Sequence, residues 1–450
     1  MADAPAEVRP GSDTAATFKR ALGPFDATMV VVGGIIGAGI FINPYLVART
    51  LDSPALVLAA WAAGGAIALI GAFAYAELGS RLPRAGGQYV YLGQAWHPLI
   101  GFLYGWALLL LIETGAMAAV AIIFAEYTLR LVGVTGASPQ PIAVAALVLV
   151  SIVNYLGVTV GSRVLNVLVV LKVAALVALI LLAWMAPASP GWLTTGRDDD
   201  TPTGLMTFGA ALIPILFAYG GWQTANYLAE EMRDPRRHLP RSLILGTLVV
   251  IAVYVLVNVA YLRVLGLEGL AATTTPAADA AAGWLGAAGE RFVAAAIAIS
   301  TFGFLNHAVL APTRVYYAMA ADGTFPPALA RLHRRYRTPG AAIVVQSVWA
   351  IALALTGTYG DLLGTVVFAD WIFFGLSVAA LFVLRARQPG HSGYRMPGYP
   401  WLPGLFVAVA VVVVASSVQA EPVRSAVGAG LLLAGCPVYY WFTRRSQRIA

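Results

Sequence analysis

Two glycine-rich stretches, residues 33–39 and 217–222, interrupt hydrophobic runs that are long enough to form helices. Glycine adds backbone freedom that a helix must remove, so each stretch predicts a break in its helix. A broken helix leaves backbone N–H and C=O groups without their usual partners, and these groups can bind a carboxylate or an ammonium ion. Together the two stretches predict a binding site for a small zwitterion.

The order of residues within the two breaks indicates which backbone groups bind the negative charge of the zwitterion and which bind the positive charge. The N–H groups of Gly37, Ala38 and Gly39, where the first helix resumes, are expected to bind a carboxylate. The carbonyl groups that end the preceding helices are expected to bind an ammonium group; they belong to Ile35, Ile36, Phe217, Ala218, Tyr219 and Gly220. The alternative is that the glycines serve only close helix packing. A dinucleotide-binding loop is excluded because no strand precedes the first stretch.

Polar side chains inside the hydrophobic runs could add further chemistry. Glu113 lies midway along one run, where it could contact a ligand, carry a proton, or form a structural pair with Lys172 or Arg314. Lys172 is also in mid-run, and a lysine there is costly unless it is paired or neutral. Asp370 and His307 are weaker candidates, each with a structural role as the alternative. Three side chains after the second break are candidates for the wall of the site: Trp222, Gln223 and Thr224.

The composition of the chain places these residues in a membrane. Hydrophobic residues make up 60% of the 450 residues and charged residues 11%, a balance typical of a membrane protein that crosses the bilayer many times. At roughly 20 apolar residues per crossing, the sequence predicts twelve transmembrane helices. Their predicted bounds are 26–48, 54–80, 98–129, 139–158, 163–186, 205–231, 241–264, 290–321, 340–357, 361–384, 401–419 and 423–443.

The positions of arginine predict the orientation of these helices. With the N-terminus inside, most arginines fall in cytoplasmic segments, as the positive-inside rule requires. This explains the net charge of +7 without a nucleic-acid partner. The same distribution predicts that both termini are cytoplasmic. Cys436 is the only cysteine, so no internal disulfide can form, which suits a bacterial inner (plasma) membrane. Charged residues near the cytoplasmic ends are expected to form ion pairs of an inner gate: Asp26, Glu77, Glu230, Glu231 and Arg314.

The number of helices in each half predicts an inverted repeat. Helices one to five span residues 24–186 and helices six to ten span residues 204–386, with an extracellular linker at 187–203. Five helices end on the opposite side of the membrane, so the second half enters it upside down. Residues 1–23, which lack the apolar core of a signal peptide, are predicted to be a cytoplasmic tail. Residues 387–450 hold helices eleven and twelve and a short tail.

Three groups of motifs resemble the amino acid–polyamine–organocation superfamily over about residues 24–400. They lie at 33–44, 75–91 and 217–240, and the last resembles the L-type (large neutral) amino acid transporter branch. The resemblance implies an all-α, LeuT-type fold of five plus five inverted helices in which helices one and six are broken. The family's usual Gly-Ser-Gly is Gly37-Ala38-Gly39 here, which removes a hydroxyl but keeps the backbone amides.

The resemblance also implies roles for single side chains. Phe217 resembles an aromatic gate that closes the site toward the outside. Lys172 falls where sodium-coupled relatives hold a sodium ion between helices one, five and eight, so its ammonium would replace the ion and Asn306 in helix eight could contact it. Eukaryotic relatives pair with a heavy chain through an extracellular cysteine. Cys436 lies in helix twelve, so no disulfide-linked heavy chain is expected.

Taken together, the sequence predicts a sodium-independent secondary transporter of amino acids that works by alternating access, as an exchanger or with proton coupling, and without a cofactor. The lack of an acidic residue in 219–224 favours neutral substrates, and the resemblance favours large ones. The alternative is a proton-coupled permease for cationic amino acids or polyamines, with Glu113 and Asp370 as counter-charges. A nutrient sensor is disfavoured by the short termini, and an enzyme by the absence of catalytic or metal-binding motifs.

Overall fold

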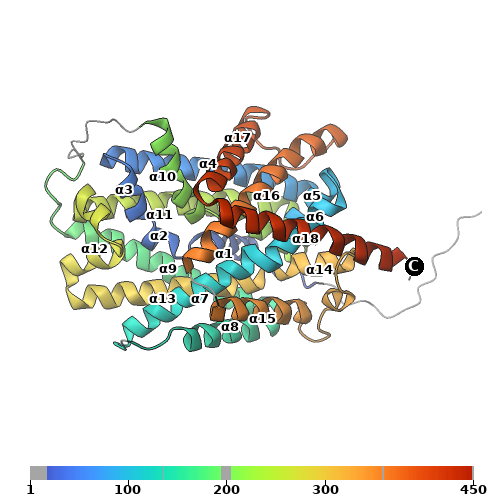
Figure 1. The fold of residues 1–450 in the computed structure, drawn as a ribbon, viewed down its shortest axis with the longest axis horizontal. Coiled ribbons are helices and arrows are strands. Elements are labelled where there is room, and N and C mark those ends of the chain that lie inside the picture. Colours follow the sequence, from blue (N-terminus) through green and yellow to red (C-terminus); the bar gives the residue numbers. More distant parts are fainter. Residues whose placement is uncertain (1–17, 135, 194–203, 357–358, 448–450) are drawn as a thin grey trace, which may run out of the picture.

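The computed structural model describes residues 18–134, 136–193, 204–356 and 359–447. Within these ranges the regular secondary structure is helical, and one isolated β-bridge pairs Leu22 with Met232. Most of the long helices run roughly along the long axis of the molecule (Figure 1). The predicted tail at 1–23 and linker at 187–203 fall partly outside the described residues.

The first half contains both short and long helices, and three of the short ones lie around residue 40. Its elements are α1 (Pro24–Ile35), α2 (Gly39–Ile42), α3 (Pro44–Thr50), α4 (Pro54–Arg81), α5 (Gln88–Ala95), α6 (Pro98–Ala107), the π-helical turn η1 (Leu108–Ile112), α7 (Glu113–Leu131), α8 (Gln140–Tyr155) and α9 (Val158–Met185).

The second half begins with another short helix. Its elements are α10 (Leu205–Ala218), the 3₁₀-helix η2 (Trp222–Glu231), α11 (Pro235–Ala272), α12 (Pro276–Leu285), α13 (Ala287–Leu310), α14 (Thr313–Ala321), the 3₁₀-helix η3 (Pro327–Ala330), α15 (Gly340–Thr356) and α16 (Tyr359–Arg387). Two helices follow the second half, α17 (Trp401–Ala420) and α18 (Pro422–Gln447).

Eight helical segments within the described ranges are long and apolar enough to cross a membrane. They coincide with eight of the predicted crossings and include α4, α9, α11, α17 and α18. Two further predicted crossings, at 139–158 and 340–357, form the shorter apolar helices α8 and α15 of 16 and 17 residues. The remaining two, at 26–48 and 205–231, are the ones that glycine breaks.

The first break has local causes in the sequence. Helix α1 ends at Ile35, and Ile36 takes an extended conformation with φ −77° and ψ 97°. Helix α2 starts at Gly39, and Pro44 begins α3, where its missing N–H costs nothing at a helix start. The first predicted crossing is therefore divided into three short helices.

The second break depends on a left-handed glycine. Helix α10 ends at Ala218, and Gly221 has φ 103°, a conformation that side chains disfavour. The chain then continues as the 3₁₀-helix η2 rather than as an α-helix. Both breaks lie in the interior of the bundle, because α1 packs against α9, α11, α13 and η2. The last two helices are peripheral, with only 22% of α17 and 17% of the α18 segment buried.

Candidate functional site

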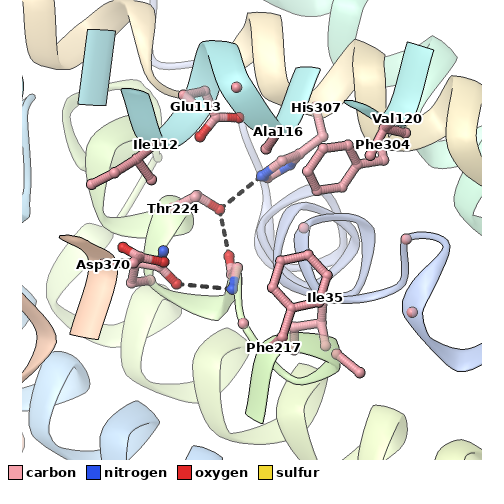
Figure 2. Close-up of a pocket in the computed structure, with 18 of the residues that line it drawn as sticks. Ile35, Ile112, Glu113, Ala116, Val120, Phe217, Thr224, Phe304, His307 and Asp370 are labelled. Atoms are coloured by element: carbon pink, nitrogen blue, oxygen red, sulfur yellow. Dashed lines mark hydrogen bonds between the residues drawn. The ribbon is translucent and has the colours of Figure 1, made fainter. Parts of the chain in front are cut away.

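The two helix breaks meet at one cavity of about 110 Å³. Its walls come from the ends of α1 and α10 and the segments that follow them, together with η1, α7, α13 and α16 (Figure 2). The predicted site residues that line it are Ile35, Gly37, Ala38, Gly39, Phe217, Ala218, Gly220, Gln223 and Glu113. Residues that are far apart in the sequence are thus brought to one place by the fold.

Two predicted site residues, Ile36 and Tyr219, are not part of the cavity wall. The carbonyl of Ile36 accepts a hydrogen bond from the Lys172 ammonium at 2.5 Å, so it is already occupied. Tyr219 is buried, with its ring centroid 5.9 Å from that of Trp61 and 5.0 Å from that of Tyr254. Its side chain therefore serves packing between α4, α10 and α11.

Some glycines of the two breaks allow close backbone packing, and others line the cavity. A Cβ added to Gly34 would lie 2.7 Å from the carbonyl oxygen of Gly221, and one added to Gly221 would lie 2.1 Å from that of Gly34. Neither position can hold a larger residue without a shift. Gly37 differs, because an added Cβ would meet only Phe304, at 3.5 Å. Gly37 thus leaves open space beside the cavity, whereas Gly34 and Gly221 join the two breaks.

Unpaired backbone donors lie on the α1 side of the cavity. The N–H groups of Gly37, Ala38 and Gly39 have no hydrogen-bond acceptor in the part of the chain that the structure describes. All three residues line the cavity. A buried N–H group without an acceptor is unfavourable, so these donors are suited to the oxygens of a carboxylate.

Carbonyl groups from both breaks share one hydroxyl donor. The Tyr254 hydroxyl on α11 lies 3.2 Å from the carbonyl oxygens of both Ile35 and Ala218. This tyrosine orients the two carbonyls that the sequence assigns to an ammonium group, while each oxygen keeps a second lone pair. Sequence reasoning missed Tyr254, because a tyrosine in an apolar run has no local signal that names its partner.

A π-helical turn brings Glu113 to the cavity. The turn η1 directly precedes α7, and the Thr114 hydroxyl donates to the carbonyl of Leu109 at 2.7 Å, five residues back. Such turns shift the register of a helix and often occur at functional sites. The carboxylate of Glu113 points toward the cavity, on the side opposite Phe217 (Figure 2).

Two carboxylates share this cavity without a cationic partner among the described residues. The structural pair suggested for Glu113 does not form, because Lys172 binds backbone carbonyls and Arg314 binds Glu231. Asp370 on α16 lines the same cavity, and its Oδ1 has no hydrogen-bond partner in the described ranges. No group of three or more potential metal ligands occurs in those ranges.

Polar side chains hold the second break in place. The Thr224 hydroxyl lies 2.8 Å from Nε2 of His307 on α13 and donates to the carbonyl of Gly221 at 2.7 Å. The N–H of Gly221 donates to Oε1 of Gln223 at 3.1 Å (Figure 2). His307, Thr224 and Gln223 all line the cavity, so α13 is connected to the second break through His307.

Trp222 does not line the cavity, contrary to the prediction. Its ring packs edge-on against Tyr75 on α4, at 4.8 Å between centroids, and stacks on Phe374 of α16 at 5.5 Å. Because Trp222 and Gln223 are consecutive, their side chains leave η2 in different directions. Trp222 therefore anchors η2 to α4 and α16 while Gln223 faces the site.

Lys172 lies on α9 and is fully buried. Its ammonium donates to the carbonyls of Gly33 at 3.1 Å and Ile36 at 2.5 Å, the last residues before the first break. It is not part of the cavity wall. The bonds to two carbonyls satisfy a charge that would be costly in this setting, and they hold the end of α1 against α9.

Asn306 does not contact Lys172, contrary to the prediction. Its side-chain amide donates to the carbonyl of Gly161 at 3.1 Å and its oxygen accepts from Asn154 at 2.8 Å. The contact between α13 and the first break is made by Ser300 instead, whose hydroxyl donates to the carbonyl of Gly37 at 3.0 Å. Asn306 thus joins α13 to α8 and α9, two turns away from the break.

One ion pair closes the end of the bundle where the segment before α1 meets η2. Arg314 and Glu231 are buried and their side chains approach to 2.6 Å. The N–H of Leu22 also donates to the carbonyl of Glu231 at 2.9 Å. Asp26 and Glu230 form no ion pair among the described residues, although both were predicted to do so; Asp26 accepts instead from Asn166 at 2.7 Å.

Glu77 forms a second buried ionic group at the end of α4. Its carboxylate lies 2.7 Å from Arg81 and 2.5 Å from Arg385 on α16, and accepts from the N–H of Met396 at 2.7 Å. This group joins α4, α16 and the segment that leads to α17. Glu77 therefore forms ion pairs, as expected, and its partners lie on α4 and α16.

Comparison with known sequences identifies the family. The sequence model of the family described as amino acid permease matches residues 22–442, which is nearly the whole chain. The chain belongs to the amino acid permease family. This confirms the superfamily that the glycine breaks and loop motifs suggest.

Curated relatives of this permease transport several kinds of amino acid. It is 31% identical over 433 residues to the serine/threonine exchanger SteT of Bacillus subtilis, across 95% of this chain and 98% of the relative. It is 29% identical over 432 residues to the human cystine/glutamate transporter, across 94% and 85%. It is 31% identical over 459 residues to the mouse large neutral amino acids transporter small subunit 2, across 97% and 85%.

The permease is therefore an amino acid transporter and not an enzyme. Its apolar helices make it a multi-pass membrane protein. The relatives differ in the substrates that their names give, so the family alone does not select one side chain. The wall of the cavity must supply that selection.

Proposed function

We propose that this permease carries neutral amino acids, large ones included, by alternating access at the cavity between the two helix breaks. The carboxylate of the substrate binds the N–H groups of Gly37, Ala38 and Gly39, and its ammonium group binds near the carbonyls of Ile35 and Ala218. The observation that carries this proposal is one cavity whose wall holds the unpaired N–H groups of the first break together with Ile35 and Ala218, whose carbonyls share one hydroxyl donor. Backbone groups alone can thus recognise the part common to all amino acids.

The size of the cavity sets a condition on large substrates. A volume of about 110 Å³ is well below the roughly 300–1,000 Å³ of pockets for drug-sized ligands. A leucine or phenylalanine side chain therefore requires a shift of aromatic side chains in the wall, which include Phe217, Phe304, Trp371 and Phe374. This supports the role of Phe217 as a gate that moves during the transport cycle.

We also propose that transport does not require sodium. Lys172 supplies a fixed positive charge beside the carbonyls that end α1. A sodium ion at the same place would compete with an ammonium group that is already bonded to those oxygens. The cycle is then either an exchange of two amino acids or a proton-coupled uptake.

The proposed architecture is a LeuT-type inverted repeat of five plus five helices followed by two more, with both termini cytoplasmic in the inner (plasma) membrane. The positions of the two broken helices, each first in its half, support it. We propose further that no heavy chain is linked by a disulfide, since the single cysteine, Cys436, lies partly buried in α18.

Uptake into proteoliposomes loaded with amino acids tests the proposal directly. Radiolabelled leucine, serine, arginine and putrescine are compared, each with external sodium and with choline in its place. We expect saturable uptake of leucine that is equal in the two salts and is accelerated or driven by internal amino acids or a proton gradient. If no neutral amino acid is taken up, the proposed substrate class is wrong. If uptake falls strongly when choline replaces sodium, sodium independence is wrong.

The second candidate is a permease for cationic amino acids or polyamines. It is favoured by Glu113 and Asp370, which face one cavity without a cationic partner among the described residues. Two buried carboxylates are costly unless they are protonated or bind a cation. Arginine or putrescine uptake that excludes leucine would support this candidate over the first.

A further inference from the structure

A second hollow lies on the outside of the bundle, between α1, α9 and α11. It has a volume of about 630 Å³ and an almost wholly apolar wall. We call it the α1–α9–α11 groove; the side chains that define it are Phe25, Met29, Val170, Val177, Leu245 and Val249. It shares no residue with the transport cavity.

The wall of the groove exposes large side chains that the protein does not cover. The exposed fraction is 57% for Phe25, 52% for Val170 and 55% for Leu245. The α1 part of the wall runs from Pro24 to Val32, which at 1.5 Å per residue is about 12 Å along the helix. The groove is thus a long apolar hollow that faces the membrane.

Arginines continue the wall at one end of the groove. On α11, Arg237 and Arg241 precede Leu245 and Val249 at intervals of four residues, so all four lie on one face of the helix. On α9, Arg163 is seven residues before Val170, which places it on the groove side two turns away. The three arginines therefore share one end of the groove.

Two hydrogen bonds show that the helices meet at that end. The Ser242 hydroxyl, next to Arg241, donates to the carbonyl of Pro24 at 3.3 Å. The Asn166 amide, one turn after Arg163, donates to the Asp26 carboxylate at 2.7 Å. The first turn of α1 is thus tied to both arginine-bearing helices, and the basic residues gather around it.

The charges of these arginines are not neutralised by the protein. Arg163, Arg237 and Arg241 are exposed, and their side chains have no ion-pair or hydrogen-bond partner in the described ranges. Asp26 on α1 accepts hydrogen bonds from Asn166 and from the N–H of Gly23, and Asp234 lies at the start of α11, three residues before Arg237. The end of the groove therefore carries an excess of positive charge where an apolar hollow opens.

We propose that the α1–α9–α11 groove binds one anionic phospholipid, with an acyl chain in the hollow and the phosphate at Arg163, Arg237 and Arg241. Burial of methylene groups favours binding of the acyl chain, and each guanidinium group can donate two hydrogen bonds to the oxygens of one phosphate. Basic pockets between membrane helices are suited to anionic headgroups, each arginine near the surface adding to the attraction. A zwitterionic lipid lacks the net charge that this end selects.

The lipid stabilises the contact between α1 and α9. Val32 and Val169 form part of the groove wall. Val169 lies close to Gly33, since a Cβ added there would be 3.0 Å from its side chain, and the Gly33 carbonyl accepts from Lys172. An acyl chain in the groove therefore packs beside the same α1–α9 contact that the hydrogen bonds of Lys172 stabilise. It favours the conformation in which α1 is packed against α9.

Lipid titration of the full-length, detergent-purified protein, followed by native mass spectrometry, tests the proposal. The probes are dioleoyl phosphatidylglycerol, dioleoyl phosphatidylcholine and glycerol phosphate. The variant Arg163→Gln/Arg237→Gln/Arg241→Gln removes the basic end. The matched control, Arg331→Gln/Arg334→Gln/Arg444→Gln, removes the same charge at exposed arginines outside the groove.

We expect wild-type protein and the control to retain phosphatidylglycerol, and the groove variant to bind it about 100-fold more weakly, at about fivefold per arginine. Ala174→Phe, which fills the hollow from an exposed position, should also weaken binding while its Tm in detergent stays unchanged. Equal loss in the control would show a general charge effect and overturn the proposal. So would equal affinity for phosphatidylcholine, or binding of glycerol phosphate as tight as that of the lipid.

Discussion

The backbones of Gly34 and Gly221 are in such close contact that a Cβ added to Gly221 would lie only 2.1 Å from the carbonyl oxygen of Gly34. The two residues are almost two hundred positions apart, and each belongs to the broken segment of its half. Their contact joins the two breaks backbone to backbone. Because α1 and η2 touch without side chains between them, residues of both breaks line one cavity.

Gly221→Ala should destabilise the permease. A side chain at φ 103° costs about 1–3 kcal/mol from backbone strain alone, and the contact with Gly34 adds to it. We expect a lower Tm and loss of transport. Gly209→Ala in α10 is the matched control, since an added Cβ there meets nothing within 4 Å. A Tm equal to that of wild type in Gly221→Ala would contradict the described contact.

Gly37→Val should block substrate binding while the fold persists. An added Cβ at Gly37 meets only Phe304, at 3.5 Å, whereas one at Gly39 would meet Ala218 at 3.0 Å. Gly37 is therefore the better probe of the carboxylate site, because valine enters the cavity without forcing α2 away from α10. Scintillation proximity binding of leucine measures the effect at unchanged Tm. Wild-type affinity in Gly37→Val would remove the carboxylate from this place.

Lys172→Met should abolish most transport while membrane expression continues. The change keeps most of the side chain's bulk but leaves the carbonyls of Gly33 and Ile36 without their donor, which costs about 1–3 kcal/mol for each unpaired group. The initial rate of uptake in proteoliposomes is the measurement. Lys19→Met, at the other lysine of the chain, which is exposed, is the control. Normal rates in Lys172→Met would show that its charge has no role.

Glu113→Gln and Asp370→Asn should separate the two candidate functions. Each change keeps the shape of the cavity wall but removes a negative charge. For a carrier of neutral amino acids we expect leucine binding within about tenfold of wild type, since the backbone groups are intact. For a carrier of cations, arginine or putrescine binding should collapse. A fall in Tm with loss of every substrate would instead assign the carboxylates a structural role.

Breaking the ion pair between Glu231 and Arg314 should destabilise the fold. Glu231→Leu leaves Arg314 buried without its partner, and such a loss costs about 3–5 kcal/mol. The double variant Glu231→Leu/Arg314→Met removes both charges and should recover much of the lost Tm. A double variant as unstable as the single one would show that the hydrogen bonds of Arg314 to α13, rather than the pair, maintain the structure.

The sequence by itself determined the class of protein, eight of the predicted crossings and the place of the breaks. A long hydrophobic run favours the membrane whatever its position in the chain, and the bounds of α4, α9 and α11 agree closely with the predicted runs. Glycine acts on its own backbone, so the ends of α1 at Ile35 and of α10 at Ala218 fall where glycine clusters predict them. These are local effects, and a local pattern is sufficient to predict them.

Only the tertiary structure decided which groups pair across the bundle. Lys172 was expected near α1 and lies there, yet Asn306 contacts Asn154 instead, and Ser300 reaches the break. Tyr254 has no sequence pattern that marks it as the donor to both breaks. A partner is chosen by the packing angle and register of two helices, which depend on every side chain between them. That choice is a property of the whole bundle, so the spacing of residues along one segment does not contain it.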